Sequence, residues 1–204
     1  MSVVLATIGA IASLAATVVK TLTVTGLAIE GLRALGGALV GFCRAVGLMQ
    51  KETKVDDLGD KAIQSNLNPD DYDCYNDYVK AVEKFDKLDP EKSKNISMED
   101  KIKKGMELAT GVIIEKYSDH LPITEFCETV GRNPEFFTES AMEKIGNIVQ
   151  NNDKTLTDIL NYINKAEKDD FKMESAFDTL MGIEKSVKPD ITDVDAAKNV
   201  LNLK

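Results

Sequence analysis

Residues 1–49 read MSVVLATIGAIASLAATVVKTLTVTGLAIEGLRALGGALVGFCRAVGLM and contain few charged side chains. Apolar or small residues recur there at alternating steps of four and three, the spacing that keeps one side of a helix against a partner. We therefore expect a helical segment with one continuous apolar side. The series is Val4, Ile8, Ile11, Ala15, Val18, Leu22, Thr25, Ile29, Leu32, Gly36, Leu39, Cys43 and Val46.

The charged residues of this stretch fall outside the apolar series; they are Lys20, Glu30, Arg33 and Arg44. Seven of the 13 glycines of the chain also lie in it, although a glycine inside a helix costs about 1 kcal/mol relative to alanine. Close approach of two helices would offset that cost. Gly37 and Gly41 form a GxxxG pair, a spacing typical of closely packed helices.

The segment from Lys20 to Gly26 alternates in a strand-like way and is rich in β-branched residues, which favours a break near Thr23–Gly26. We expect two helices of about 18–22 residues each, forming a hairpin. A single continuous helix is the alternative.

The composition changes abruptly at Lys51. Residues 1–50 carry three basic side chains and one acidic side chain, a net charge of +2. Because the whole chain has a net charge of −9, the remaining residues carry a net charge of −11. Residues 51–56 are expected to form a charged linker, and residues 57–204 an acidic all-α domain. All five prolines lie in that domain, where each can separate two helices. The expected fold is all-α: a glycine-rich apolar amino-terminal helix or hairpin, followed by an array of about seven short helices.

Helix boundaries in the acidic domain follow from its capping signals. Asn68-Pro69 predicts a helix start, with the helix expected to run to about Leu88 and to end at Asp89-Pro90. Thr192 is expected to begin the last helix. The apolar residues of that helix are Val194, Ala197, Val200 and Leu201.

No catalytic or metal-binding pattern emerges, so we expect no cofactor, no small-molecule substrate and no enzymatic activity. The dense acidic group at residues 70–77 lacks the glycine and glutamate of a calcium loop. The single histidine, His120, and Cys127 lie on opposite sides of Pro122 without an evident orienting group. An acidic chain without a basic patch is not expected to bind nucleic acid.

The cysteines, Cys43, Cys74 and Cys127, are odd in number and widely spaced, which favours reduced thiols in a cytoplasmic protein. Ser2–Val19 is uncharged; without a basic region before it, no cleavable signal peptide is expected. The run is also shorter than the roughly 20 residues of a membrane-spanning helix. Membrane association, as an anchor or as a pore-former that inserts the amino-terminal hairpin, is an alternative.

The function expected from these patterns is non-enzymatic interaction or assembly. The amino-terminal segment would pack against copies of the protein, giving a homo-oligomer, or against another helical protein. A buried core hairpin is the simpler structural alternative. The residues expected at the interface are Val4, Ile8, Ile11, Val18, Leu22, Ile29, Leu32, Gly37, Leu39 and Gly41.

A small helical chain with an apolar hairpin resembles the helical partner proteins of type VII secretion. Phe85 and Asp89 match a Phe-x-x-x-Asp pattern. The Trp-x-Gly turn usual in those proteins cannot be present, because the chain has no tryptophan. The resemblance implies a secretion-associated helical partner protein as a further alternative.

Overall fold

The computed structural model describes residues 7–24, 28–119, 121–150 and 154–203, and over these residues the fold is helical, without strands. The predicted all-α class is confirmed. The elements are α1 (Ile8–Val24), α2 (Ile29–Ala45), α3 (Val55–Ser65), the 3-10 helix η1 (Pro69–Asp71), α4 (Tyr75–Glu83), α5 (Pro90–Asn95), α6 (Met98–Tyr117), α7 (Ile123–Arg132), α8 (Glu139–Val149), α9 (Lys154–Ile163), α10 (Asp170–Val187) and α11 (Asp193–Leu201).

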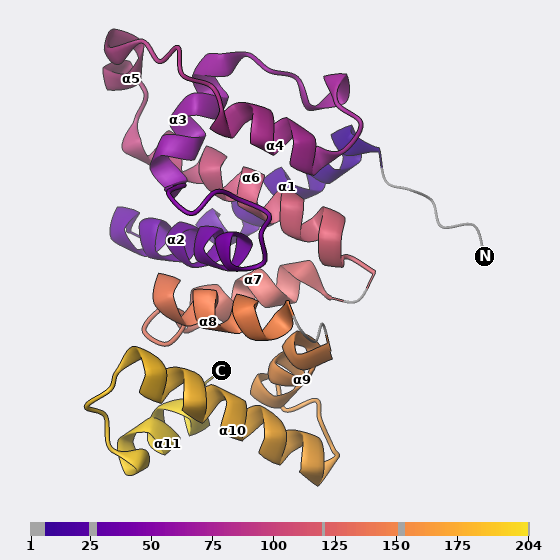
Figure 1. Ribbon diagram of the computed structural model, residues 1–204, viewed down its shortest axis with the longest axis vertical. Helices are drawn as coiled ribbons and strands as arrows, with labels where there is room; N and C mark the ends of the chain where they lie inside the picture. Colours follow the sequence, from indigo (N-terminus) through magenta and orange to yellow (C-terminus); the bar gives the residue numbers. More distant parts are fainter. Residues whose placement is uncertain (1–6, 25–27, 120, 151–153, 204) are drawn as a thin grey trace, which may run out of the picture.

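Helix α6 lies at the centre of one end of the molecule and packs against α1, α2, α3, α4 and α7 (Figure 1). Its residues Ile102, Met106 and Ile113 are fully buried. The last three helices form the other end, where α10 packs against α8, α9 and α11. One continuous hydrophobic cluster runs through both ends, from Ile11 to Leu203.

The amino-terminal stretch forms two helices rather than one, and Thr25 and Gly26, near the expected break, lie outside the described residues. The two helices are positioned mainly by the rest of the chain: α1 packs on α6 and α7, whereas α2 lies between α6 and α8. Arg44 fixes the end of α2, because its guanidinium pairs with Glu139 and Glu143 of α8 and donates to the Thr53 carbonyl at 3.1 Å. The stretch shares one hydrophobic core with the acidic part of the chain. Residues 51–56 therefore mark a change in composition and do not separate two cores.

Nine α-helices, instead of about seven, follow residue 54 in the described part of the chain. The helix expected from Pro69 to Leu88 is divided, because Tyr72 and Cys74 are extended. Helix α4 is capped from a distance: the Glu115 carboxylate of α6 accepts the backbone N–H groups of Tyr75 at 2.6 Å and Asn76 at 2.9 Å. Asp89, expected to mark a helix end, instead caps the start of α5.

Helices α3 and α6 cross at close range, and each contributes a glycine to the contact. A Cβ atom on Gly59 would lie 1.8 Å from the Lys101 carbonyl oxygen, and one on Gly105 would lie 1.9 Å from the Val55 carbonyl oxygen. Only glycine allows these two backbones to approach so closely. This crossing fixes α3 against the central helix.

Candidate functional site

Six of the residues expected at an interface are buried by the chain itself: Gly41 and five apolar side chains. The relative exposures of the five apolar residues are all 6% or less; they are Ile11, Val18, Leu22, Leu32 and Leu39. The alternating spacing therefore marks the side of each helix that faces the protein interior. A further role of these residues in binding a partner stays a prediction.

The other expected interface residues are placed differently. Ile8 is half-buried and Ile29 is exposed, whereas Val4 lies outside the described residues. Gly37 and Gly41 face α8: a Cβ on Gly41 would lie 2.8 Å from the Glu139 carbonyl oxygen. The GxxxG pair thus allows α2 to approach α8 closely within the same chain.

Helix α1 is only half covered by the rest of the protein. Its inner side, which carries Ala15, Val18 and Leu22, is buried. Its other side is open to solvent. We call this side the α1 open face; its exposed residues are Ala10, Ser13, Leu14, Thr17, Lys20 and Thr21. Lys20 is the only charged residue in the sequence of α1. A large part of this face is therefore uncharged.

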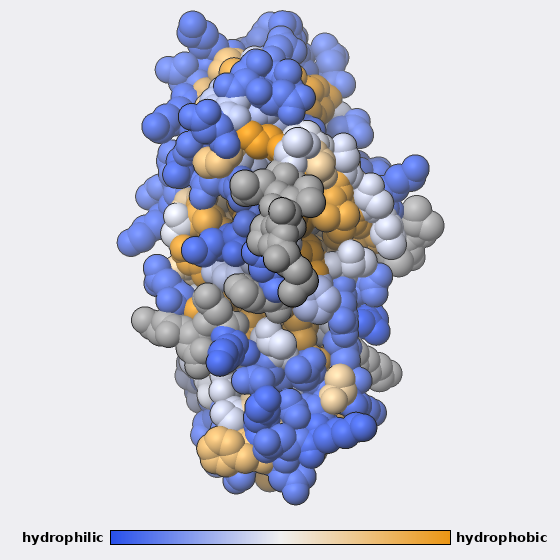
Figure 2. Space-filling model, turned by 90° about the vertical axis from the view of Figure 1, so that its right-hand side faces the viewer, coloured by the Kyte–Doolittle hydropathy of each residue, from blue (hydrophilic) through white to orange (hydrophobic). Residues whose placement is uncertain are grey.

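The two exposed threonine hydroxyls of this face are already hydrogen-bonded within the helix. Thr17 donates to the Ser13 carbonyl at 2.8 Å, and Thr21 donates to the Thr17 carbonyl at 3.0 Å. Such bonds satisfy the threonine hydroxyls within the helix and reduce their need for hydrogen bonds to water. Figure 2 shows a band of orange and white residues at the upper right of a largely blue surface, on the side where α1 lies.

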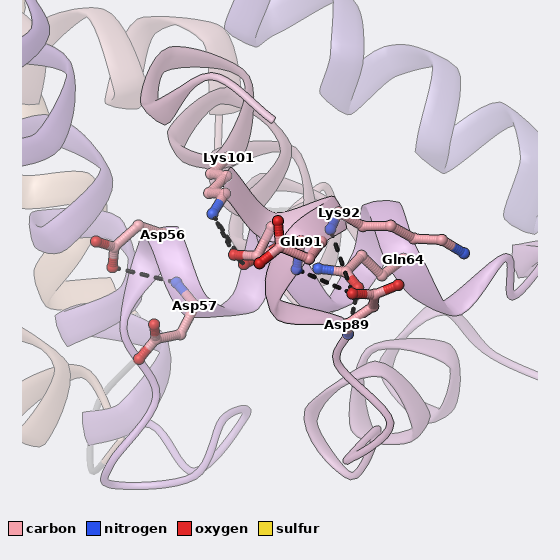
Figure 3. Close-up of polar contacts among 9 residues, drawn as sticks. Asp56, Asp57, Gln64, Asp89, Glu91, Lys92 and Lys101 are labelled. Atoms are coloured by element: carbon pink, nitrogen blue, oxygen red, sulfur yellow. Dashed lines mark hydrogen bonds and ion pairs between the residues drawn. The ribbon is translucent and has the colours of Figure 1, made fainter. Parts of the chain in front are cut away.

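A polar cluster joins α3, α5 and α6 (Figure 3). The Asp60 carboxylate pairs with Lys101 Nζ at 2.9 Å, accepts from Gln64 Nε2 at 2.7 Å, and also accepts from the Ser93 hydroxyl. Gln64 in turn accepts the Asp89 N–H at 2.9 Å. Burial of Asp60 opposes its charged form, but the hydrogen bonds from Ser93, Gln64 and Lys101 outweigh this effect and hold its pKa below the usual value.

Ser93 and Lys101 lie close enough to suggest a serine nucleophile with a lysine base, since Nζ is 2.7 Å from the hydroxyl oxygen. A lysine that acts as a base must be neutral. Lys101 is instead engaged in an ion pair with the Asp60 carboxylate, and the Ser93 hydroxyl donates to that carboxylate rather than to the lysine. The cluster therefore serves to hold three helices together. Sequence reasoning missed it because Ser93 and Lys101 are distant in sequence from Asp60.

Two other buried carboxylates also join separate segments. Glu83 of α4 accepts the Gln50 N–H at 2.9 Å and the Thr53 hydroxyl, which fixes the loop after α2. Glu184 of α10 accepts from Lys188 at 2.8 Å and from Asn199 of α11 at 2.7 Å. Glu184 lines a polar cleft of about 360 Å³ between α10, α11 and the loop before α8. Each carboxylate has the partners that a buried charge requires.

The cysteines are unpaired, and Cys43 and Cys127 are fully buried, whereas Cys74 is half-buried. Burial raises the pKa of all three thiols, and that of Cys127 reaches about 12. Because the thiolate is the reactive form, these environments disfavour nucleophilic chemistry. His120 lies outside the described residues, and within them no cluster of three or more possible metal ligands occurs.

Within the residues described, no helix has both the length and the apolar character that crossing a membrane demands. Comparison of the chain with protein-family models, with curated proteins and with solved structures gives no match.

Proposed function

We propose that the protein is a non-enzymatic helical interaction protein, and that the α1 open face is the surface that receives a helix of another protein chain. The observation that supports this proposal is the combination of exposure, a single charged residue and internally bonded threonine hydroxyls on α1. A helix face with these properties loses little when water is removed from it.

Covering this face with a partner helix would bury apolar surface without breaking the threonine hydrogen bonds. Leu14 is 47% exposed, so its complete burial would contribute about 1 kcal/mol. Thr17 and Thr21 would keep their hydrogen bonds to the helix backbone in a complex. The small side chains of Ala10 and Ser13 would let a partner helix approach closely.

A binding role also agrees with the state of the buried polar groups. Asp60, Glu83 and Glu184 each have partners from their own chain. These carboxylates are engaged in joining separate segments of the fold, which favours an architectural role for them over acid–base chemistry.

The test is site-specific cross-linking of the full-length protein in its native cells. A photo-reactive residue replaces Leu14 or Thr17, and the matched control replaces Asp178 on the exposed side of α10. We expect an adduct with a helical protein from the α1 positions and none from position 178. The substitution Leu14→Glu, combined with the reactive residue at position 17, should remove the adduct because it places a charge on the face.

Two outcomes would contradict the proposal. One is the absence of an α1-specific protein adduct under conditions in which the protein is folded. The other is flotation of the full chain with phosphatidylglycerol-containing vesicles that Leu14→Glu abolishes. That second result would assign the α1 open face to a lipid surface.

A further inference from the structure

The last helix carries apolar residues on two opposite sides. Ala196 and Val200 are buried, whereas Val194 is 77% exposed and Leu201 is 67% exposed. Val194 and Leu201 are seven residues apart and so lie on the same side of α11, two turns from each other. Ala197, between them, is half-buried. We call Val194, Ala197 and Leu201 the α11 stripe.

An apolar groove adjoins this stripe. Its volume is about 290 Å³, and Leu201 and Met173 form part of its wall. The remaining apolar lining comes from Tyr162, Ile163, Val200 and Leu203. Leu201 is thus a projecting side chain at the edge of a hollow, which gives this end of the molecule both a knob and a hole.

We propose that a second copy of this chain covers the α11 stripe, with the two α11 helices antiparallel about a twofold axis. Such an axis requires a surface that is complementary to itself. The midpoint between Val194 and Leu201 lies between Ala197 and Lys198. An axis at that point places Val194 of each copy against the partner's Leu201, with the small Ala197 where the helices cross.

The charges of α11 suit this arrangement. Asp195 lies near its amino-terminal end and Lys198 near its middle, and both are exposed. In the antiparallel pair, Lys198 lies two residues, or about 3 Å along the helix axis, from the partner's Asp195. Each copy would contribute two such unlike charges to the contact.

The surroundings of the stripe also favour a second copy of this acidic protein. The chain carries a net charge of −9, yet residues 185–201 contain three lysines and three aspartates and are neutral as a group. Two copies that meet here avoid the repulsion that their acidic surfaces would otherwise cause. Because the stripe is small, the dimer is expected to be weak and in exchange with the monomer.

Sedimentation equilibrium of the full chain, from low micromolar to near-millimolar concentration, tests the proposal. We expect a reversible monomer–dimer equilibrium. Leu201→Glu should raise the dissociation constant at least tenfold, and Val194→Lys should do the same if the first variant fails to fold. Ile63→Glu, a substitution at an exposed apolar residue of α3, is the matched control and should leave the equilibrium unchanged.

A single cysteine at the axis tests the arrangement of the two helices. Lys198→Cys should give a disulfide-linked dimer on mild oxidation, whereas Lys103→Cys on α6 and the parent chain should not. The proposal is overturned by a parent chain that stays monomeric throughout, by an unchanged equilibrium in Leu201→Glu, or by no covalent dimer through position 198. It is independent of the function proposed for α1. If Leu14→Glu abolished self-association and Leu201→Glu did not, the α11 contact would be wrong and the α1 proposal would stand.

Discussion

Replacement of Gly105 by alanine should severely weaken the crossing of α3 and α6. The new Cβ atom would lie 1.9 Å from the Val55 carbonyl oxygen. Cβ atoms in real structures essentially never approach another heavy atom of this kind more closely than 3.0 Å. The two backbones must therefore move apart by about 1 Å, the difference between these distances. Because the obstacle is backbone rather than the end of a flexible side chain, no change of rotamer relieves it.

The expected loss follows from what this crossing holds together. Leu58, Ile102 and Met106 are fully buried beside it, and their contacts weaken when the helices separate. Overpacking of a core costs about 1–3 kcal/mol, and a backbone obstacle places Gly105→Ala at the upper end. Alanine also favours the helix by about 1 kcal/mol, so we expect a net loss of about 2 kcal/mol in the free energy of unfolding. That loss corresponds to a fall in Tm of about 4–8 °C.

Urea denaturation followed by circular dichroism at 222 nm measures this loss. Gly182→Ala on α10 is the matched control, because a Cβ there has no neighbouring atom within 4 Å. It should gain up to about 1 kcal/mol from helix propensity alone. Equal stabilisation by Gly105→Ala and Gly182→Ala would refute the reasoning, since it would mean that α3 and α6 are not held at this distance.

Two further predictions concern the core and the Asp60 cluster. Deletion of residues 1–49 removes Leu32, Leu39 and Phe42 from the core, a loss of about 2 kcal/mol for each side chain; the fragment should lack a cooperative thermal transition, and a fragment that melts cooperatively with the full chain's ellipticity per residue would contradict this. The lowered pKa of Asp60 contributes stability that is present above its unfolded-state pKa and is lost as the pH falls through its folded-state pKa. Urea midpoints measured from neutral pH to about pH 3 should therefore fall less steeply for Asp60→Asn than for the parent chain, and identical pH profiles would count against the cluster.

The buried side of the amino-terminal helices was predictable, but what covers it was not. The spacing of Ile11, Val18, Leu32 and Leu39 depends on helical periodicity, which the sequence carries directly. Whether such a side meets its own chain or another one depends on contacts with α6 and α8, which are distant in the sequence. The spacing of apolar residues within one helix contains no information about which distant helices will pack against it.

Helix α11 shows a second limit of the same kind. Val194, Ala197, Val200 and Leu201 form one apolar group in the sequence, yet Val200 faces inward while Val194 and Leu201 face outward. A helix with apolar residues on two sides does not reveal which side the rest of the chain will cover. The role of Gly59 and Gly105 was missed for a related reason. Each is a single glycine in a charged helix, and its importance depends on the crossing of the two helices, which the sequence does not reveal.

The capping of α4 by Glu115 has a consequence for how the protein opens. The first N–H groups of α4 are bound by a carboxylate 40 residues further along the chain, so the first turn of α4 cannot retain these bonds once α6 has moved away. Amide hydrogen exchange at Tyr75 and Asn76 should therefore report on excursions of α6 as well as on fraying of their own helix. A short helix of nine residues thereby becomes part of the same cooperative unit as the longest helix in the described part of the molecule.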